Sequence, residues 1–260
     1  MGPIDRRTFV QDTDRFLAEA LPHFSSVWTS DHFMEHAGYR LECWTHLAWI
    51  AARHPTPMLG TCVLANSYRN PALMAKMATT LQELSGGRLI FGIGAGWNRE
   101  EMANHGAEYR TRWRLMRERV LAMIALWTND VAEYHGDFVN FDPVWQWPKP
   151  IQKPHPPVII GGDGPKATEA LLEYGDGWIP RANRGAAPLG QRIADMNRLL
   201  AERGRGPVPI SVFGAPTEPA ALEEYRRLGV TRAVFRLPPA PADEVMPVLE
   251  RHTELVRQLR

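Results

Sequence analysis

The sequence predicts an α/β fold of the (β/α)8 barrel type. Three observations carry this prediction. Short apolar runs alternate with helix-like segments along the chain, and the runs are nearly continuous, as in strands covered on both faces. The length of 260 residues is also that of one such barrel. We therefore expect a single domain over residues 1–260.

Strands are predicted where the chain is apolar and β-branched, at 27–29, 58–64, 88–93, 158–160, 177–179, 210–213 and 233–235. Helical periodicity predicts helices at 8–21, 44–53, 70–84, 111–127, 165–174, 188–203, 218–228 and 242–258. Asn70 before Pro71 is a helix-start signal, and Asn98 with Glu101 resembles a capping box for a further helix.

A closed barrel of this type has eight strands, whereas seven are predicted here, and the missing one is the first. Residues 1–7 contain no run able to serve as a buried strand. Either the start of the chain is misplaced or the barrel is incomplete. An incomplete barrel leaves the strands at 27–29 and 233–235 with unpaired edges, which proteins cover or pair, for example with a partner subunit.

Residues 131–157 interrupt the alternation. The stretch 134–138 resembles a hairpin, and a segment rich in Pro and Trp follows it. We expect an excursion over the surface, with a lid as one interpretation.

Composition excludes several classes of protein. The net charge of +1 creates no strong field for nucleic acid or an anionic membrane, and no apolar run reaches the length of a membrane span. Two cysteines, Cys43 and Cys62, provide no disulfide framework and fit a reducing compartment. We expect a cytoplasmic protein that acts on a small molecule.

The first candidate site is Asp31-His32, directly after the strand at 27–29. Histidine can supply or accept a proton near neutral pH or balance charge on a cofactor. Both residues are candidate catalytic groups. Because neighbours along an extended chain point in opposite directions, we expect Asp31 to anchor the backbone instead of orienting the imidazole of His32. The alternative is a turn-forming Asp beside a loop His.

The second candidate follows the strand at 88–93, where Gly92, Gly94 and Gly96 alternate and precede Trp97. Glycines leave the backbone open to a flat ligand or to a close neighbouring element, and both interpretations stand. Trp97 either stacks on a ring or belongs to the core. Cys62 has no evident local base, so we expect an inert strand cysteine.

The third candidate is the turn Gly161-Gly162-Asp163-Gly164 before a predicted helix. Amide groups at a helix start face an anion well, so a phosphate site is indicated, with a tight turn as the alternative. A dinucleotide fingerprint also matches here, but its position after four β/α units argues against that class. The histidines have no metal-ligand spacing, and we predict no metal site.

Taken together, these motifs resemble the bacterial luciferase-like superfamily of flavin and deazaflavin oxidoreductases. The resemblance runs from about residue 8 to 182 and more loosely to the end. It rests on Ser30-Asp31-His32-Phe33, Leu59–Leu64, Tyr68-Arg69-Asn70-Pro71, Leu84–Arg88 leading into Gly92–Asn98, Pro157–Gly162 and Tyr174–Trp178.

The resemblance implies a cofactor at the carboxyl ends of the strands, with His32 near the reactive carbon of its ring. It implies a non-proline cis peptide at Cys62-Val63 that supports one face of the ring. Asn66, Gly94, Gly96 and Trp97 would border the ring, and Gly161 to Gly164 would hold a phosphate. It also implies a homodimer.

The triplet Asp31-His32-Phe33 is more similar to the F420-dependent branch than to the FMN branch. The expected activity is hydride transfer between F420 and an organic substrate, with an FMN-dependent monooxygenase as the alternative. A non-catalytic, degenerate cofactor-binding barrel is a further alternative. Sugar-phosphate dehydrogenases of this branch carry Trp and Glu where this chain has His36 and Trp97, which argues against a sugar-phosphate substrate.

Overall fold

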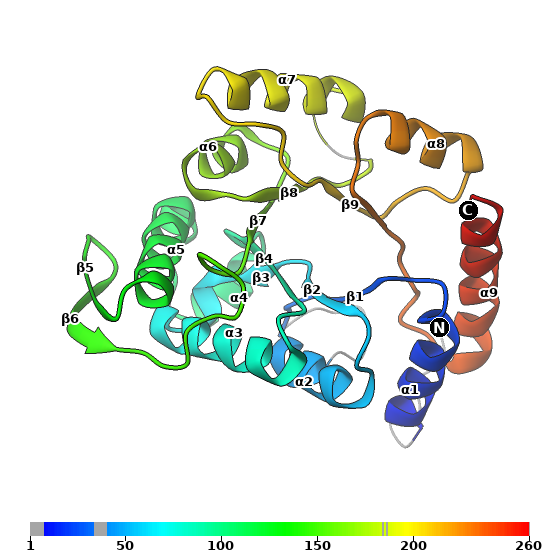
Figure 1. The fold of residues 1–260 in the computed structure, drawn as a ribbon, viewed down its shortest axis with the longest axis horizontal. Coiled ribbons are helices and arrows are strands. Elements are labelled where there is room, and N and C mark those ends of the chain that lie inside the picture. The colour runs from blue at the N-terminus through cyan, green and yellow to red at the C-terminus, as the bar shows by residue number, and fades with distance from the viewer. Residues whose placement is uncertain (1–7, 34–40, 184, 186, 260) are drawn as a thin grey trace.

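Strands alternate with helices along the computed structural model, which describes residues 8–33, 41–183, 185 and 187–259 (Figure 1). The strands are β1 (Ser26–Thr29), β2 (Met58–Thr61), β3 (Leu64–Ala65), β4 (Leu89–Gly94), β5 (Val131–His135), β6 (Asn140–Trp145), β7 (Val158–Gly161), β8 (Gly177–Ile179), β9 (Ser211–Phe213) and β10 (Arg232–Val234). The α-helices are α1 (Phe9–Ala20), α2 (Cys43–Arg53), α3 (Pro71–Ser85), α4 (Arg99–Asn104), α5 (Arg112–Thr128), α6 (Pro165–Tyr174), α7 (Leu189–Ala201), α8 (Pro219–Arg227) and α9 (Ala242–Gln258). Short 3-10 turns form η1 (Asn66–Tyr68) and η2 (Tyr109–Thr111).

The main sheet is parallel and runs in the order β1-β2-β4-β7-β8, with β3 also paired to β4. Single parallel bridges continue it from β8 toward β9, and β9 pairs in parallel with β10. Each helix returns the chain to the same end of the sheet, so the carboxyl ends of these strands meet at one edge. The predicted α/β fold with a parallel sheet is confirmed.

The described residues do not close this sheet into a barrel. No strand among residues 8–33, 41–183, 185 and 187–259 pairs with the outer edge of β1 or of β10. Helices α1 and α9 lie side by side at this position (Figure 1), and the rings of Phe24 and Phe235 meet edge to face with centroids 6.3 Å apart. The predicted open edges are present, and helix packing lies beside them.

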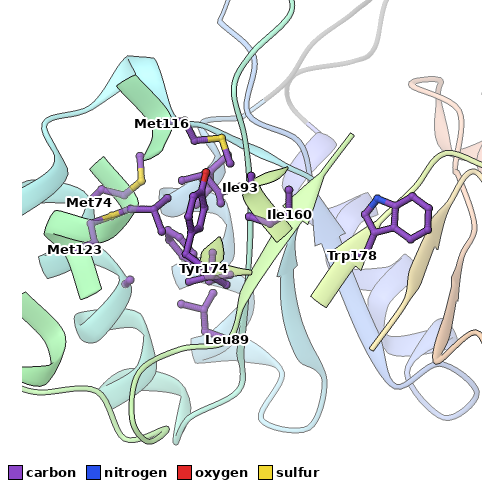
Figure 2. Packing of buried hydrophobic residues seen from close by; sticks show 14 of the residues in the cluster. Met74, Leu89, Ile93, Met116, Met123, Ile160, Tyr174 and Trp178 are labelled. Carbon is purple, nitrogen blue, oxygen red and sulfur yellow. The ribbon is translucent and has the colours of Figure 1, made fainter. Parts of the chain in front are cut away.

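The largest core lies between the sheet and its covering helices. Figure 2 shows methionines of α3 and α5 packed with Tyr174 of α6 against strand side chains. Its labelled members are Met74, Leu89, Ile93, Met116, Met123, Ile160, Tyr174 and Trp178. The helix predicted for residues 111–127 supplies several of these contacts, because helical spacing places its apolar residues on one face.

A smaller cluster fills the other side of the sheet. Its buried members are Ile90, Ile159 and Ile179, from β4, β7 and β8. Trp28 of β1 and Phe213 of β9 both pack against it. Strands so far apart in the sheet reach one cluster only if the sheet curves toward it, and the fold is therefore barrel-like although its edges stay apart.

One predicted strand is interrupted. Residues 58–64 were expected to form a single strand, but β2 ends at Thr61, and β3 starts only at Leu64, after a cis peptide bond at Cys62-Val63. The hydroxyl of Thr61 donates to the carbonyl oxygen of Gly92 at 2.7 Å and accepts from the N–H of Gly92 at 2.8 Å. A side chain thus satisfies the groups of β4 that the interrupted strand leaves unpaired.

The excursion after α5 contains the predicted hairpin, formed by β5 and β6 in antiparallel pairing. The buried carboxylate of Glu118 on α5 accepts N–H bonds from the hairpin turn, at residues 137–139. Further on, Gln146 and Gln152 bond to residues of α3. The excursion is confirmed, and these contacts and Figure 1 place it on the outer helices. A role as a lid stays a prediction.

Gly92→Ala tests how tightly β2 and β4 meet. A Cβ at Gly92 would lie 2.1 Å from the carbonyl oxygen of Thr61, a backbone atom that cannot move aside alone. We expect the free energy of unfolding to fall by about 2 kcal/mol or more, measured by urea denaturation. Gly206→Ala is the matched control, since a Cβ there meets open space. Equal stability of the two variants would contradict the packing described.

Candidate functional site

The predicted site residues gather where the strands end. Asp31 and His32 follow β1, Asn66 follows β3, and Trp97 follows β4. The turn at residues 162–164 follows β7 and leads into α6. Because these parallel strands share one edge, that edge brings together residues far apart in sequence, as barrel enzymes do at the same face.

Asp31 is buried and fully engaged. Its carboxylate accepts two hydrogen bonds from the guanidinium of Arg69, at 2.7 Å to Oδ2 and 2.9 Å to Oδ1. It also accepts the N–H of Ala65 in β3 at 3.2 Å. Burial opposes the charge on Arg69, but its bonds to Asp31 and Glu42 raise its pKa overall. These contacts are those of an anchor, and they engage both oxygens of the Asp31 carboxylate.

His32 is oriented by a residue that the sequence reasoning assigned only to helix capping. Its Nδ1 lies 3.0 Å from Oε2 of Glu101, which comes from α4 and is fully buried. On the other side, the imidazole meets the ring of Trp97 edge to face, with centroids 5.5 Å apart. Trp97 itself is 64% exposed, so its ring is available to a ligand and is not a core side chain.

An aromatic group flanks His32. Phe33 lies edge to face with Tyr68 at 5.1 Å, and Tyr68 lies 4.5 Å from His105, all between ring centroids. The hydroxyl of Tyr68 donates to Glu101, and burial together with that bond raises its pKa. Phe33 is nearly half exposed. The site therefore has an aromatic, largely apolar wall on this side.

The side chain of Val63 fills the space beside Gly94 and Gly161, two glycines at the ends of the adjoining strands β4 and β7. A Cβ on Gly94 would lie 2.7 Å from one methyl of Val63, and a Cβ on Gly161 would lie 2.7 Å from the other. Close packing of a neighbouring element therefore explains both glycines, and Val63 is left as the surface above them. Burial raises the pKa of the Cys62 thiol to about 12, which agrees with an unreactive cysteine.

Asn66 carries a buried polar atom without a partner. Its Nδ2 donates to the carbonyl oxygen of Gly94 at 3.2 Å, whereas its Oδ1 has no hydrogen-bond partner in the described part of the chain. The hydroxyl oxygen of Ser67 is likewise buried and has no hydrogen-bond partner among the described residues. Gly96 beside them has a φ of 84°, a conformation that favours glycine. Buried polar atoms without partners are rare, and these two are therefore candidate contacts for a polar ligand.

The turn before α6 leaves the helix start open. Gly162 has a φ of 133°, and Gly164, at the N-cap, offers no side chain to the free amides. The carboxylate of Asp163 is engaged by Arg181 (Nε at 3.0 Å) and by Arg192 (Nη1 at 2.8 Å). Asp163 was predicted to bind the cofactor. That role stays a prediction, and in the structure Asp163 also anchors two arginines, whose charges exceed its own.

Three residues of the site were not identified as such from the sequence: Glu101, Tyr68 and Arg69. Tyr68 and Arg69 were recognised only as part of a motif, and Glu101 only by its spacing from Asn98. No local signal couples them to Asp31 and His32. Among the described residues no group of His, Cys, Asp or Glu is arranged to hold a metal ion, and no helix among them is long and apolar enough to cross a membrane.

A family comparison agrees with this geometry. Residues 17–252 match the sequence model of the luciferase-like monooxygenases, and the chain belongs to this family, whose members are oxidoreductases. An uncharacterised protein of Mycobacterium tuberculosis is 35% identical over 213 residues, covering 81% of this chain and 74% of that protein. An F420-dependent glucose-6-phosphate dehydrogenase of Amycolatopsis mediterranei is 34% identical over 169 residues, or 62% of this chain and 50% of that enzyme. The chain thus matches only half the length of that characterised relative.

The fold is shared with solved structures of low identity. The monooxygenase RslO1 from Streptomyces bottropensis superposes with a TM-score of 0.80 at 18% identity, covering 95% of this chain and 93% of that one. An F420-dependent secondary alcohol dehydrogenase, solved with an F420-acetone adduct, superposes with a TM-score of 0.67 at 20% identity. This match covers 96% of this chain and 80% of that one. These likenesses show that the chain shares its α/β fold with these two enzymes.

Asp31→Asn tests the anchor. Removing one partner of a buried ion pair leaves Arg69 with Glu42 as its remaining carboxylate partner, and we expect a loss of about 3 kcal/mol in the free energy of unfolding. Glu19→Gln is the matched control, because Glu19 pairs with Arg15 on the exposed surface of α1 and contributes below about 0.5 kcal/mol. Both values come from urea denaturation. A change below 1 kcal/mol for Asp31→Asn would show that the pair is not an anchor.

Proposed function

We propose that this chain is an F420-dependent oxidoreductase that moves hydride between the deazaflavin and an organic substrate. The observation that carries the proposal is the imidazole of His32, held at a strand end by Glu101 and bordered by the exposed ring of Trp97. The names of relatives support the choice of F420. An FMN-dependent monooxygenase is the alternative, since an FMNH2-dependent dimethylsulfone monooxygenase of Pseudomonas putida is 32% identical over 117 residues.

The residues present fit such a cofactor. Val63 offers an apolar support for a flat ring, and Asn66 Oδ1 and Ser67 Oγ are buried polar atoms that lack partners within the described residues. The open start of α6 fits a phosphate, and Arg181 beside it is about half exposed. The bound cofactor supplies the hydride chemistry, and the protein supplies position and electrostatics.

His32 supplies the proton chemistry in this proposal. An alcohol that loses hydride must also lose its hydroxyl proton, and a carbonyl that gains hydride must gain a proton. The imidazole is the group at the site able to do both near neutral pH. Asp31 has no part in this step, because its carboxylate is held by Arg69.

Two exposed aromatic side chains, Trp97 and Phe33, indicate which class of substrate the site accepts. The exposed ring of Trp97 stands where sugar-phosphate dehydrogenases of this branch carry Glu, and with Phe33 it favours an apolar substrate. His36, the other departure noted in the sequence, lies outside the described residues. A single domain over residues 1–260, a homodimer and a cytoplasmic location remain part of the proposal, on family analogy and cysteine content.

Separate titrations with F420 and FMN test the cofactor. We expect micromolar binding of F420, followed by quenching of protein tryptophan fluorescence because Trp97 borders the ring. Trp97→Phe is the control that locates the signal, and it should lose most of the quenching while keeping binding. Micromolar binding of FMN alone would overturn the choice of cofactor in favour of the monooxygenase.

His32→Ala tests the proton chemistry. With F420 and a panel of secondary alcohols or ketones as probes, we expect turnover to fall by roughly 10²-fold or more with F420 affinity retained. His135→Ala is the matched control, because His135 is exposed on the hairpin. Unchanged turnover in His32→Ala would refute the assignment. F420 binding without turnover by the wild-type protein would favour the non-catalytic alternative.

A further inference from the structure

Glu101 is a buried carboxylate that the proposed chemistry does not yet use. It is 0% exposed, and it belongs to α4, whereas three of the groups bonded to it come from the segment after β1 and from η1. Burying an ionised carboxylate is costly unless hydrogen bonds replace its water. The arrangement of donors around Glu101 is therefore well defined.

We propose that Glu101 is a positioning residue that holds neutral His32 in the tautomer with its hydrogen on Nδ1. A carboxylate can only accept hydrogen bonds. Nδ1 of His32 lies 3.0 Å from Oε2 of Glu101, so with Glu101 ionised this nitrogen is the one that carries the hydrogen. Nε2 then carries the lone pair, and it has no partner among the described residues. The inference rests on the proposed role of His32 and adds the residue that sets its direction.

The other donors keep Glu101 in its accepting role. The N–H of Phe33 donates to Oε1 at 2.8 Å, and the hydroxyl of Tyr68 donates to Oε2. The raised pKa of Tyr68 keeps that hydroxyl protonated. Both carboxylate oxygens are thus engaged by groups from the two segments that frame His32. The same carboxylate fixes the backbone after His32 and the ring of His32 itself.

The alternative role for Glu101 is that of the second residue in a capping box with Asn98. Of the two bonds that define such a box, the described hydrogen bonds include only the one made by the Asn98 side chain. The side chain of Asn98 accepts the N–H groups of Glu100 and Glu101, as a cap does. The reciprocal bond of a capping box would run from the backbone N–H of Asn98 to Glu101. The described hydrogen bonds of Asn98 do not include it. The carboxylate reaches instead to a residue 69 positions earlier in the chain.

A fixed tautomer matters because proton transfer requires the lone pair on the nitrogen that faces the reacting group. In catalytic triads the acid that holds a histidine has this role, and its replacement by the amide yields the wrong tautomer. The orienting partners of metal-bound histidines act likewise. Glu101 stands in that relation to His32.

Nitrogen-15 NMR of the protein without cofactor tests the proposal, with labelled histidine and a pH at which the imidazoles are neutral. His32→Gln assigns the signals. In the wild type we expect the Nδ1–H tautomer to dominate at His32. In Glu101→Gln, the amide satisfies these three described neighbours only with its oxygen toward Phe33 N–H and its NH2 toward Nδ1 and the Tyr68 hydroxyl. His32 should therefore reverse to the Nε2–H tautomer.

Tyr68→Phe is the matched control, because it removes one donor to Glu101 but keeps the carboxylate beside Nδ1. We expect its His32 to keep the Nδ1–H tautomer. Turnover by Glu101→Gln should fall by roughly 10²-fold or more, with F420 affinity retained.

An Nε2–H tautomer in the wild type, or an unchanged tautomer in folded Glu101→Gln, would overturn the proposal. The wild-type spectrum alone can do so even if the variant does not fold. The spectra are recorded without cofactor, so they decide the role of Glu101 separately. Failure of F420 binding, or unchanged turnover in His32→Ala, would count against the proposed function and leave the tautomer result standing.

Discussion

The buried ion pair between Asp31 and Arg69 is the interaction on which the rest of the site depends. Two hydrogen bonds join the end of β1 to the residue after η1, and a third joins Asp31 to Ala65 in β3. Desolvating two charges is costly, and such a pair persists only with good geometry and few unsatisfied donors. Because His32 is the next residue after Asp31, its imidazole is placed by this anchor.

Two acids with different roles frame His32. Side chains of neighbouring residues in an extended chain point in opposite directions, so Asp31 turns inward to Arg69 while His32 faces the strand ends. The partner of the imidazole is therefore Glu101, from a different β/α unit. The adjacent acid secures the backbone, and the distant acid orients the ring. The orientation of His32 therefore depends on how β1 and α4 are placed relative to each other, because His32 follows β1 and Glu101 belongs to α4.

The floor of the site is set by packing of Val63. This side chain follows the break between β2 and β3, where Thr61 bonds to Gly92 in place of regular strand pairing. Val63 covers Gly94 and Gly161, where any larger residue would collide with it. An apolar surface results, beside the Oδ1 of Asn66, which has no partner among the described residues, and close to the open start of α6. A flat ring with polar edges and an anionic tail matches that combination.

The sequence by itself determined the elements and the strand ends that carry the site. For α3, Asn70 accepts the N–H of Ala72 at 2.9 Å, and Gly86 ends the helix with a φ of 66°, both readable from local residue types. The tertiary structure alone decided the partner of His32, the anchoring of Asp163 by Arg181 and Arg192, and the hairpin's place on the outer helices. Local propensity fixes where a helix or strand begins, because it depends on neighbours in sequence. Hydrogen-bond partners of buried charges depend on which distant segments the packed sheet brings within reach, and spacing along the chain does not encode that.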